Sequence, residues 1–326
     1  GTTAGKRKAF RCLISDTPIE YDYIRREGKA GRMGQKLMAI VAEGTRGRIY
    51  LTPTVEAETT ARKAKPTWKP EMVLPDNTRD FKTPNYGLNT YGDLFTPRQL
   101  VALTTLSDLV AEVRVRIFQD AINAGMENDG KGLEGGGIGA TAYAEAVSVY
   151  LAFAVNRCAD FSNSVTRWVP GNQKVMNLFG KQAIPMTWDY PEAAILADTV
   201  GGFAPAIKYI ADCIEKLTPA AAGFATQADA QTQIVSNLKI ISTDPPYYDN
   251  IGYADLSDFF YIWLRRALRS VFPATLATIA VPKAEELIAT PYRHGSKEKA
   301  EAFFLEGMTQ VIHNLAEKAH PEGPVT

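Results

Sequence analysis

The stretch that decides the fold is Ile234–Ser242, IVSNLKIIS, which runs directly into Thr243–Tyr248, TDPPYY. Its apolar and β-branched residues predict a buried strand. Two consecutive prolines end any regular structure after that strand. Further on, Asp255–Asp258 is typical of a helix N-terminus, and the helix should continue to about Arg269. A strand, a loop and a helix in this order form the βα unit of a doubly wound α/β sheet, in which functional groups lie at the carboxyl end of the strand.

Working outward from this unit, we expect an α/β fold with a partial Rossmann-like sheet, a large and mainly helical insertion, and a small β-rich N-terminal segment. The sequence divides into a basic, β-rich segment at 1–69, a helical block at 70–230 and the sheet-forming part at 231–326. The helical block predicts two long helices, one starting at the Thr96-Pro97 cap and ending near Ala124, the other running from Thr141 to about Asp160.

The shorter elements follow from the same signals. We expect a strand at Gly47–Thr52, helices at Gly34–Glu43, Asn172–Phe179, Ala204–Lys216 and Lys297–Ala319, a linker at Ala57–Pro70, extended loop at Pro70–Gly92 and a flexible interhelical loop containing Gly135–Gly139.

The charge is balanced, with 36 Lys and Arg against 36 Asp and Glu, which excludes a polycation that coats nucleic acid non-specifically. Residues 1–69 are nevertheless basic, with about fifteen Lys and Arg against about seven Asp and Glu. This end is either a phosphate-facing surface or a solvated basic face. Three scattered cysteines and no long apolar stretch predict a cytoplasmic protein with reduced thiols and no membrane span, and both ends look cut.

The four residues Asp244-Pro245-Pro246-Tyr247 indicate the chemistry. An exocyclic amine is a poor nucleophile, because its lone pair is delocalised into the ring. A carboxylate and a backbone carbonyl that accept its two N–H groups would direct that lone pair towards the methyl group of S-adenosylmethionine. Two prolines hold both acceptors in place, and the tyrosine offers a flat face for a flipped base. The structural alternative is a proline-rich turn with a capping aspartate.

Several segments resemble a family of large prokaryotic adenine-specific DNA methylases that contain a zinc ribbon. The resemblance rests on Gly28–Arg32 (GKAGR), Thr83–Gly87 (TPNYG), Asp93–Leu100 (DLFTPRQL), Thr243–Phe260 (TDPPYYDNIGYADLSDFF) and Val281–Leu287 (VPKAEEL). It therefore extends over nearly the whole chain. It implies a methyltransferase core with an inserted target-recognition block, S-adenosylmethionine as cofactor and DNA as partner.

The sequence departs from that family in two respects. The glycine-rich segment that holds the cofactor's methionine part lies upstream in the family, so this chain is expected to be a partial enzyme, inactive alone. Cys12-Leu13-Ile14-Ser15 has one thiolate where a zinc knuckle needs two, and no second pair follows. We therefore predict no bound metal.

The resulting hypothesis assigns the catalytic role to Asp244, Pro245, Pro246 and Tyr247, with Asp244 and Pro245 also facing the cofactor. Candidate substrate-binding residues are Tyr248 and Tyr253 beside the base, and Lys283 and Arg293 at phosphates or the target base. For each, packing against a helix or a solvated loop is the alternative.

The predicted activity is S-adenosylmethionine-dependent methylation of the amino group of adenine in DNA. Three alternatives stay open: an RNA amino-methyltransferase, a protein glutamine methyltransferase and a non-catalytic nucleic-acid-binding module. The oligomeric state is not determined by the sequence.

Overall fold

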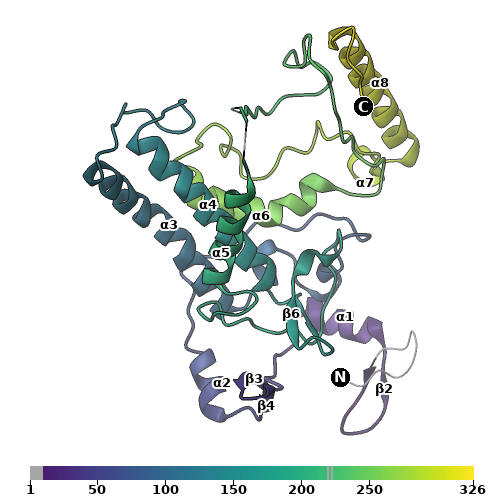
Figure 1. Cartoon of the computed structure of the whole chain (residues 1–326). Helices are drawn as coiled ribbons and strands as arrows, with labels where there is room; N and C mark the ends of the chain where they lie inside the picture. The colour runs from purple at the N-terminus through teal and green to yellow at the C-terminus, as the bar shows by residue number, and fades with distance from the viewer. Residues whose placement is uncertain (1–9, 219, 222) are drawn as a thin grey trace. The chain divides into compact units, whose positions relative to one another are not determined.

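The computed structural model describes residues 10–218, 220–221 and 223–326, and it contains helices and small antiparallel sheets. Figure 1 shows the ribbon. The chain divides into two compact units. Unit 1 consists of Gly1–Lys216 and Phe259–Ala280, and unit 2 of Leu217–Asp258 and Val281–Thr326. Helix α6, Tyr253–Leu268, contributes its first six residues to unit 2 and the rest to unit 1.

The described sheets are three two-stranded antiparallel hairpins. They pair β1 (Phe10–Arg11) with β2 (Pro18–Ile19), β3 (Ile40–Gly44) with β4 (Gly47–Leu51), and β5 (Arg167–Val169) with β6 (Lys174–Met176). The fold is thus α/β only in the loose sense that it mixes helices and strands. Among the described residues there is no Rossmann-like sheet.

The remaining elements are helices. They are α1 (Tyr21–Lys29), α2 (Val55–Ala61), η1 (Thr83–Tyr86), η2 (Tyr91–Leu94), α3 (Pro97–Asn123), α4 (Ala140–Phe161), η3 (Leu178–Gly180), α5 (Phe203–Lys216), α7 (Pro291–His294) and α8 (Lys297–Lys318). Within the described ranges, every helix is too short or too polar to cross a bilayer.

Two predicted helices and one linker are wrong. Strand β3 replaces the second half of the helix expected at Gly34–Glu43, because Val41 and Ala42 find cross-strand partners in β4, the strand that the sequence did predict. The expected helix at Asn172–Phe179 is instead β6 followed by a short 3₁₀ turn. The expected linker at Ala57–Pro70 begins inside α2, which Thr54 caps by accepting the N–H of Ala57.

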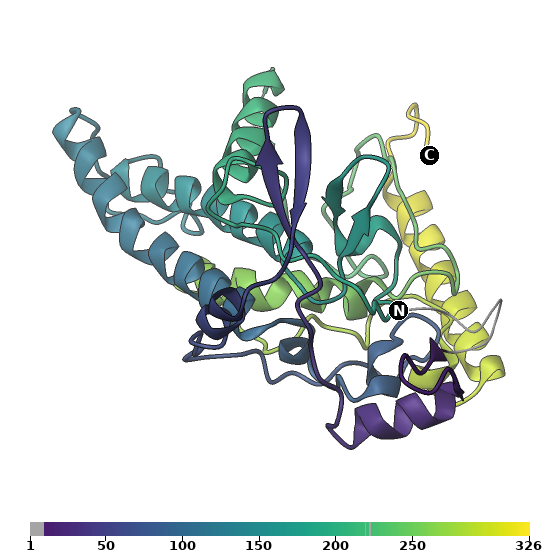
Figure 2. The ribbon, with the colours of Figure 1, turned by 90° about the horizontal axis from the view of Figure 1, so that it is seen from below.

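The two long helices of unit 1 confirm the helical prediction. Helix α3 begins with a capping box in which the Thr96 hydroxyl accepts the Gln99 N–H and the Gln99 side chain accepts the Thr96 N–H. Leu100, Leu103 and Val110 lie on its buried face. Helix α4 packs beside α3, and small residues such as Ala144 and Ala152 line its buried side. Figures 1 and 2 both show these two helices running side by side.

Aromatic side chains on the second half of α6 complete the core of unit 1. Phe259 and Trp263 are each 1% exposed. Phe95 stacks on Phe259 at 5.6 Å and meets Trp263 edge-on at 5.4 Å between ring centroids. Trp68 contacts the other side of Trp263 at 5.6 Å. Burial of such rings makes a large contribution to stability.

In unit 2 the predicted buried strand Ile234–Ser242 is wrong. The segment forms turns and only isolated parallel bridges, Lys239 with Ala319 and Ile241 with Val325. Ile240 is 72% exposed, whereas Ile241 is 6% exposed. A strand depends on a neighbour along its whole length to satisfy its backbone, and the described chain supplies one at these two positions only.

Candidate functional site

The Asp244–Tyr247 loop lies at the carboxyl end of this bridged segment. Just before it, Thr243 donates its N–H to the Thr326 carbonyl at 2.6 Å, and Thr326 donates to Ile241 at 3.1 Å. Asp244 is exposed, and its Oδ1 accepts the hydroxyl of Tyr247 at 3.1 Å. That hydrogen bond raises the pKa of the Tyr247 phenol. The arrangement presents one carboxylate beside one aromatic ring, and the ring is 53% exposed.

The backbone after the prolines is held in an unusual conformation. Tyr248 has φ +57°, in the left-handed region that residues with side chains rarely occupy. Its N–H donates to the Pro246 carbonyl at 3.0 Å, and its carbonyl accepts the N–H of Ala289 at 3.1 Å. Among the described residues, no backbone N–H donates to the Pro245 carbonyl. The predicted mechanism needs two acceptors, a carboxylate and a backbone carbonyl. In this turn the Pro245 carbonyl accepts no backbone N–H of the described residues, so it can serve as the second acceptor.

The side chain of Tyr248 connects this turn to α8. Its hydroxyl donates to Glu301 Oε1 at 2.8 Å, which raises the pKa of Tyr248, and its ring meets Phe304 edge-on at 5.2 Å. Both contacts favour a positioning role over the predicted contact with a base. Tyr253, the first residue of α6, is 43% exposed, so its ring remains accessible.

A buried ionic cluster lies beneath the first turn of α6. Arg293 contacts Asp255 at 2.8 Å and Glu286 at 2.6 Å, and its side chain is 12% exposed. Tyr292 donates its hydroxyl to Asp255, and Glu286 accepts the N–H of Ala254 at 2.9 Å. Burial raises the pKa of Asp255, although the hydrogen bond from Arg293 opposes that change. The cluster ties α7 to the start of α6.

A second ion pair lies one turn further along α6. Lys283 Nζ contacts Asp258 Oδ2 at 2.6 Å, and the carboxylate is 3% exposed. The other oxygen, Oδ1, accepts the N–H of Val281 at 2.8 Å. The two cations predicted to contact phosphate or the target base, Lys283 and Arg293, thus neutralise buried carboxylates.

Sequence reasoning did not identify Asp255, Asp258 and Glu286 as partners of these cations. From the sequence, Asp255 and Asp258 are assigned only to the N-terminus of a helix. The one available signal was a pair of acidic residues three positions apart at a helix N-terminus, and it does not say which cations of the chain lie nearby.

No family model, curated protein or solved structure matches this chain. The resemblance to the methylase family therefore remains a prediction.

The glycine-rich loop between α3 and α4 does not fit the cofactor. Its N–H groups are directed at a side chain of its own: Asp129 accepts the N–H of Lys131 at 3.2 Å and that of Ile138 at 3.1 Å. The backbone hydrogen bonds from Ile138 and Lys131 lower the pKa of Asp129. Because a carboxylate already occupies these donors, the loop would repel the carboxylate of a bound methionine group.

These glycines have a packing explanation. A Cβ on Gly137 would lie 2.2 Å from the Lys131 carbonyl oxygen, and one on Gly139 would lie 2.7 Å from the Asp129 nitrogen. The loop is indeed interhelical, as predicted, and close backbone contacts build it.

The Asp244 loop fits the amine part of the predicted reaction better. The Tyr247 hydroxyl occupies Oδ1 of Asp244, and a carboxylate has several acceptor positions, so capacity remains for a substrate N–H. The Pro245 carbonyl supplies a second acceptor without a backbone donor.

Proposed function

We propose that this chain carries the amine-binding part of an S-adenosylmethionine-dependent methyltransferase acting on adenine in DNA. The observation that carries the proposal is the exposed Asp244 carboxylate. The turn that holds it is fixed at Tyr248, whose hydroxyl donates to Glu301 of α8 and whose carbonyl accepts the N–H of Ala289. The parallel bridges between 239–241 and 319–325 support it further, since they give the segment before Asp244 the direction of a βα crossover.

The chemistry assigned to these residues is orientation. Asp244 accepts one N–H of the adenine amino group, and the Pro245 carbonyl accepts the other. These two bonds turn the nitrogen lone pair out of the plane of the base. Tyr247 stacks on the flipped base. The Pro246 carbonyl accepts the N–H of Tyr248, which holds the turn. When bound, S-adenosylmethionine supplies the methyl group. Fixing reactants in this way contributes strongly to rate.

The test uses this chain together with the glycine-rich cofactor segment that the resemblance implies, and it measures transfer of labelled methyl from S-adenosylmethionine to DNA of mixed sequence. Structured RNA and glutamine-containing peptides are the parallel substrates. We expect incorporation into DNA, on the adenine amino group, that Asp244→Asn reduces by about a hundredfold or more. The matched control is Asp212→Asn, which changes an aspartate on α5 whose side chain is 45% exposed and pairs with Lys208 at 2.9 Å.

Methylation of RNA or peptide in place of DNA would reject the adenine-DNA assignment while keeping the role of Asp244. Salt-dependent DNA binding that Asp244→Ala leaves unchanged, without methyl transfer, would favour the non-catalytic module. Equal activity of the Asp244→Asn and Asp212→Asn variants would reject the site.

A further inference from the structure

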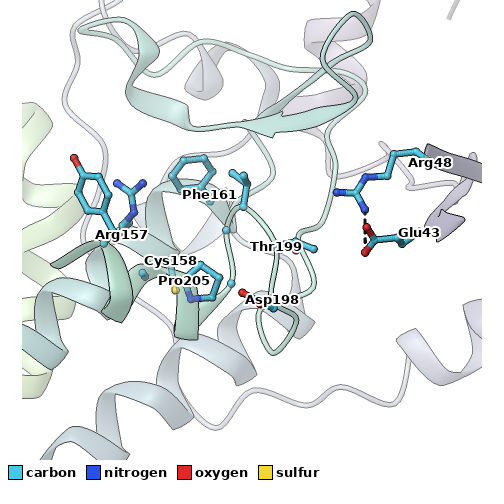
Figure 3. Close-up of a pocket in the computed structure, with 13 residues that line it drawn as sticks. Glu43, Arg48, Arg157, Cys158, Phe161, Asp198, Thr199 and Pro205 are labelled. Atoms are coloured by element: carbon cyan, nitrogen blue, oxygen red, sulfur yellow. Dashed lines mark ion pairs between the residues drawn. The ribbon is translucent and has the colours of Figure 1, made fainter. Parts of the chain in front are cut away.

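A cavity of about 430 Å³ lies in unit 1, away in sequence from the Asp244 loop. Three segments line it: the end of α4, residues 198–209 that lead into α5 and form its first half, and the β3–β4 hairpin. Figure 3 shows Arg157 and Phe161 on one side, the Glu43–Arg48 pair on the other, and Asp198 and Thr199 between them. Its volume is within the range of small-ligand sites in proteins.

Arg157 is the most specific feature of this cavity. Its guanidinium carbon lies 4.1 Å from the centroid of the Tyr209 ring and 5.5 Å from that of Phe161. Within the part of the chain that the structure describes, Arg157 makes no ion pair. Both rings are within cation–π distance, and such contacts use the ring faces and leave the guanidinium's N–H groups able to donate. A planar fork of donors with no carboxylate partner suits an oxyanion, above all phosphate.

The other walls carry both signs of charge. Arg48 contributes a second guanidinium, paired loosely with Glu43 at 3.6 Å. Asp198 adds an exposed carboxylate, so the four charged residues of the lining sum to zero. A ligand that is only anionic gains little from such a lining. A ligand with an anion at one end and hydrogen-bond donors at the other can use both signs.

We infer that this cavity binds a nucleotide unit, with its phosphate on Arg157 and its hydroxyl or amino donors on Asp198. The phosphate group is common to a free nucleoside monophosphate and to one unit of a nucleic acid strand. This inference does not depend on methyl transfer, because every residue in it belongs to unit 1 and none to the Asp244 loop.

The test is calorimetric titration of the whole chain with adenosine monophosphate, adenosine, inorganic phosphate and a short single-stranded oligonucleotide. We expect the monophosphate to bind more tightly than adenosine or phosphate alone. Arg157→Gln should weaken it about tenfold or more, since a charge-assisted pair is lost. Arg116→Gln is the matched control, because Arg116 is an exposed helical arginine on α3 whose side chain is 83% exposed.

Two further variants keep the test informative if Arg157→Gln does not fold. Arg157→Lys retains the charge but loses the planar guanidinium, and Arg48→Gln removes the charge on the opposite wall. Both variants should bind the monophosphate more weakly. Circular dichroism checks that each variant is folded. If the oligonucleotide displaces the monophosphate, the natural ligand is a nucleic acid strand. If it does not, the natural ligand is the free nucleotide. Inorganic phosphate binding as tightly as the monophosphate, no saturable binding at millimolar concentration, or full affinity in folded variants would each overturn the inference.

Discussion

Arg293 is the residue on which the buried charges near the candidate site depend. It is the cation shared by Asp255 and Glu286, at 2.8 and 2.6 Å. Removal of one partner from a buried pair leaves an uncompensated charge, which costs far more than the pair itself contributes. Arg293 is therefore expected to matter for folding whether or not it ever touches a substrate.

We expect Arg293→Ala to lower the free energy of unfolding by about 3–5 kcal/mol at neutral pH, because the buried carboxylate of Asp255 and the partly buried one of Glu286 lose their shared cation. Burial already raises the pKa of Asp255, and loss of Arg293 raises it further. A carboxyl with a raised folded pKa binds its proton more tightly when folded, so its stability contribution is present at acid pH and lost as pH rises. The defect should therefore shrink when urea unfolding is repeated near pH 5.

The matched control for this prediction is Arg116→Ala, which changes an exposed arginine of α3 and should cost less than about 0.5 kcal/mol. Arg293→Lys should be milder than Arg293→Ala, since it keeps a charge but loses the fork that reaches two carboxylates. Equal losses in Arg293→Ala and Arg116→Ala would contradict a structural role for the cluster.

The interhelical loop has the glycine-rich sequence of a ligand-binding loop but not its geometry. Glycine-rich loops bind phosphates when their N–H groups face outward, but here Asp129 accepts them. We expect Gly137→Ala to destabilise the protein by about 1–3 kcal/mol, because its Cβ would meet the Lys131 carbonyl at 2.2 Å. Thermal unfolding with and without S-adenosylmethionine measures this.

Gly171→Ala is the control for that loop, since a Cβ there meets no atom within 4 Å, and its effect should be within about 0.5 kcal/mol. A shift in the melting temperature of the unsubstituted chain on addition of S-adenosylmethionine, absent in Gly137→Ala, would show that the loop is a cofactor site after all.

At the same scale, helices and strands differ in how far sequence predicts them. Helices α3, α4, α5, α6 and α8 appear close to the expected residues, because a cap such as Thr96 and a 3.6-residue period act within the element itself. The segments at 34–43 and 172–179 became strands or turns because pairing partners elsewhere in the chain decided their conformation. The described part of the basic end contains two hairpins, but helices α1 and α2 occupy it as well, so the β-rich prediction covers only part of this segment.

For the whole molecule, the two units should differ in stability. All four tryptophans, at 68, 168, 188 and 263, belong to unit 1, whereas α8 belongs to unit 2. Large apolar side chains of unit 2, such as Ile234 and Leu238, are 75% and 65% exposed, which reduces its hydrophobic stabilisation. We expect far-UV circular dichroism to lose signal at a lower urea concentration than tryptophan fluorescence changes.

Coincident transitions by both probes would instead indicate one cooperative unit. In that case α6, which contributes residues to both units, would be the element that couples them. A variant that weakens unit 1, such as Trp263→Ala, then shifts the whole transition seen by both probes. In the two-step case it shifts fluorescence and the later part of the circular dichroism transition, because α3, α4 and α5 belong to unit 1, and leaves the early loss of signal from α8 unchanged.

The three-part division at 1–69, 70–230 and 231–326 is a functional prediction. The two compact units have other bounds, because residues 259–280 pack with the first part of the chain. The sequence by itself determined helices α3, α4, α5, α6 and α8, the turn at Pro245–Pro246 and the presence of a carboxylate beside an aromatic ring. These depend on local sterics and hydrogen bonds between near neighbours.

Only the tertiary structure decided which charges meet. It placed Lys283 on Asp258 and Arg293 on Asp255, and it fixed Tyr248 on Glu301, over separations of 25, 38 and 53 residues. It also gave Ile234–Ser242 bridged neighbours at Lys239 and Ile241 only, among the residues that the structure describes, and a strand requires them along its whole length. Ion pairs and strand pairs are contacts between distant parts of a chain, and no local pattern specifies the second member.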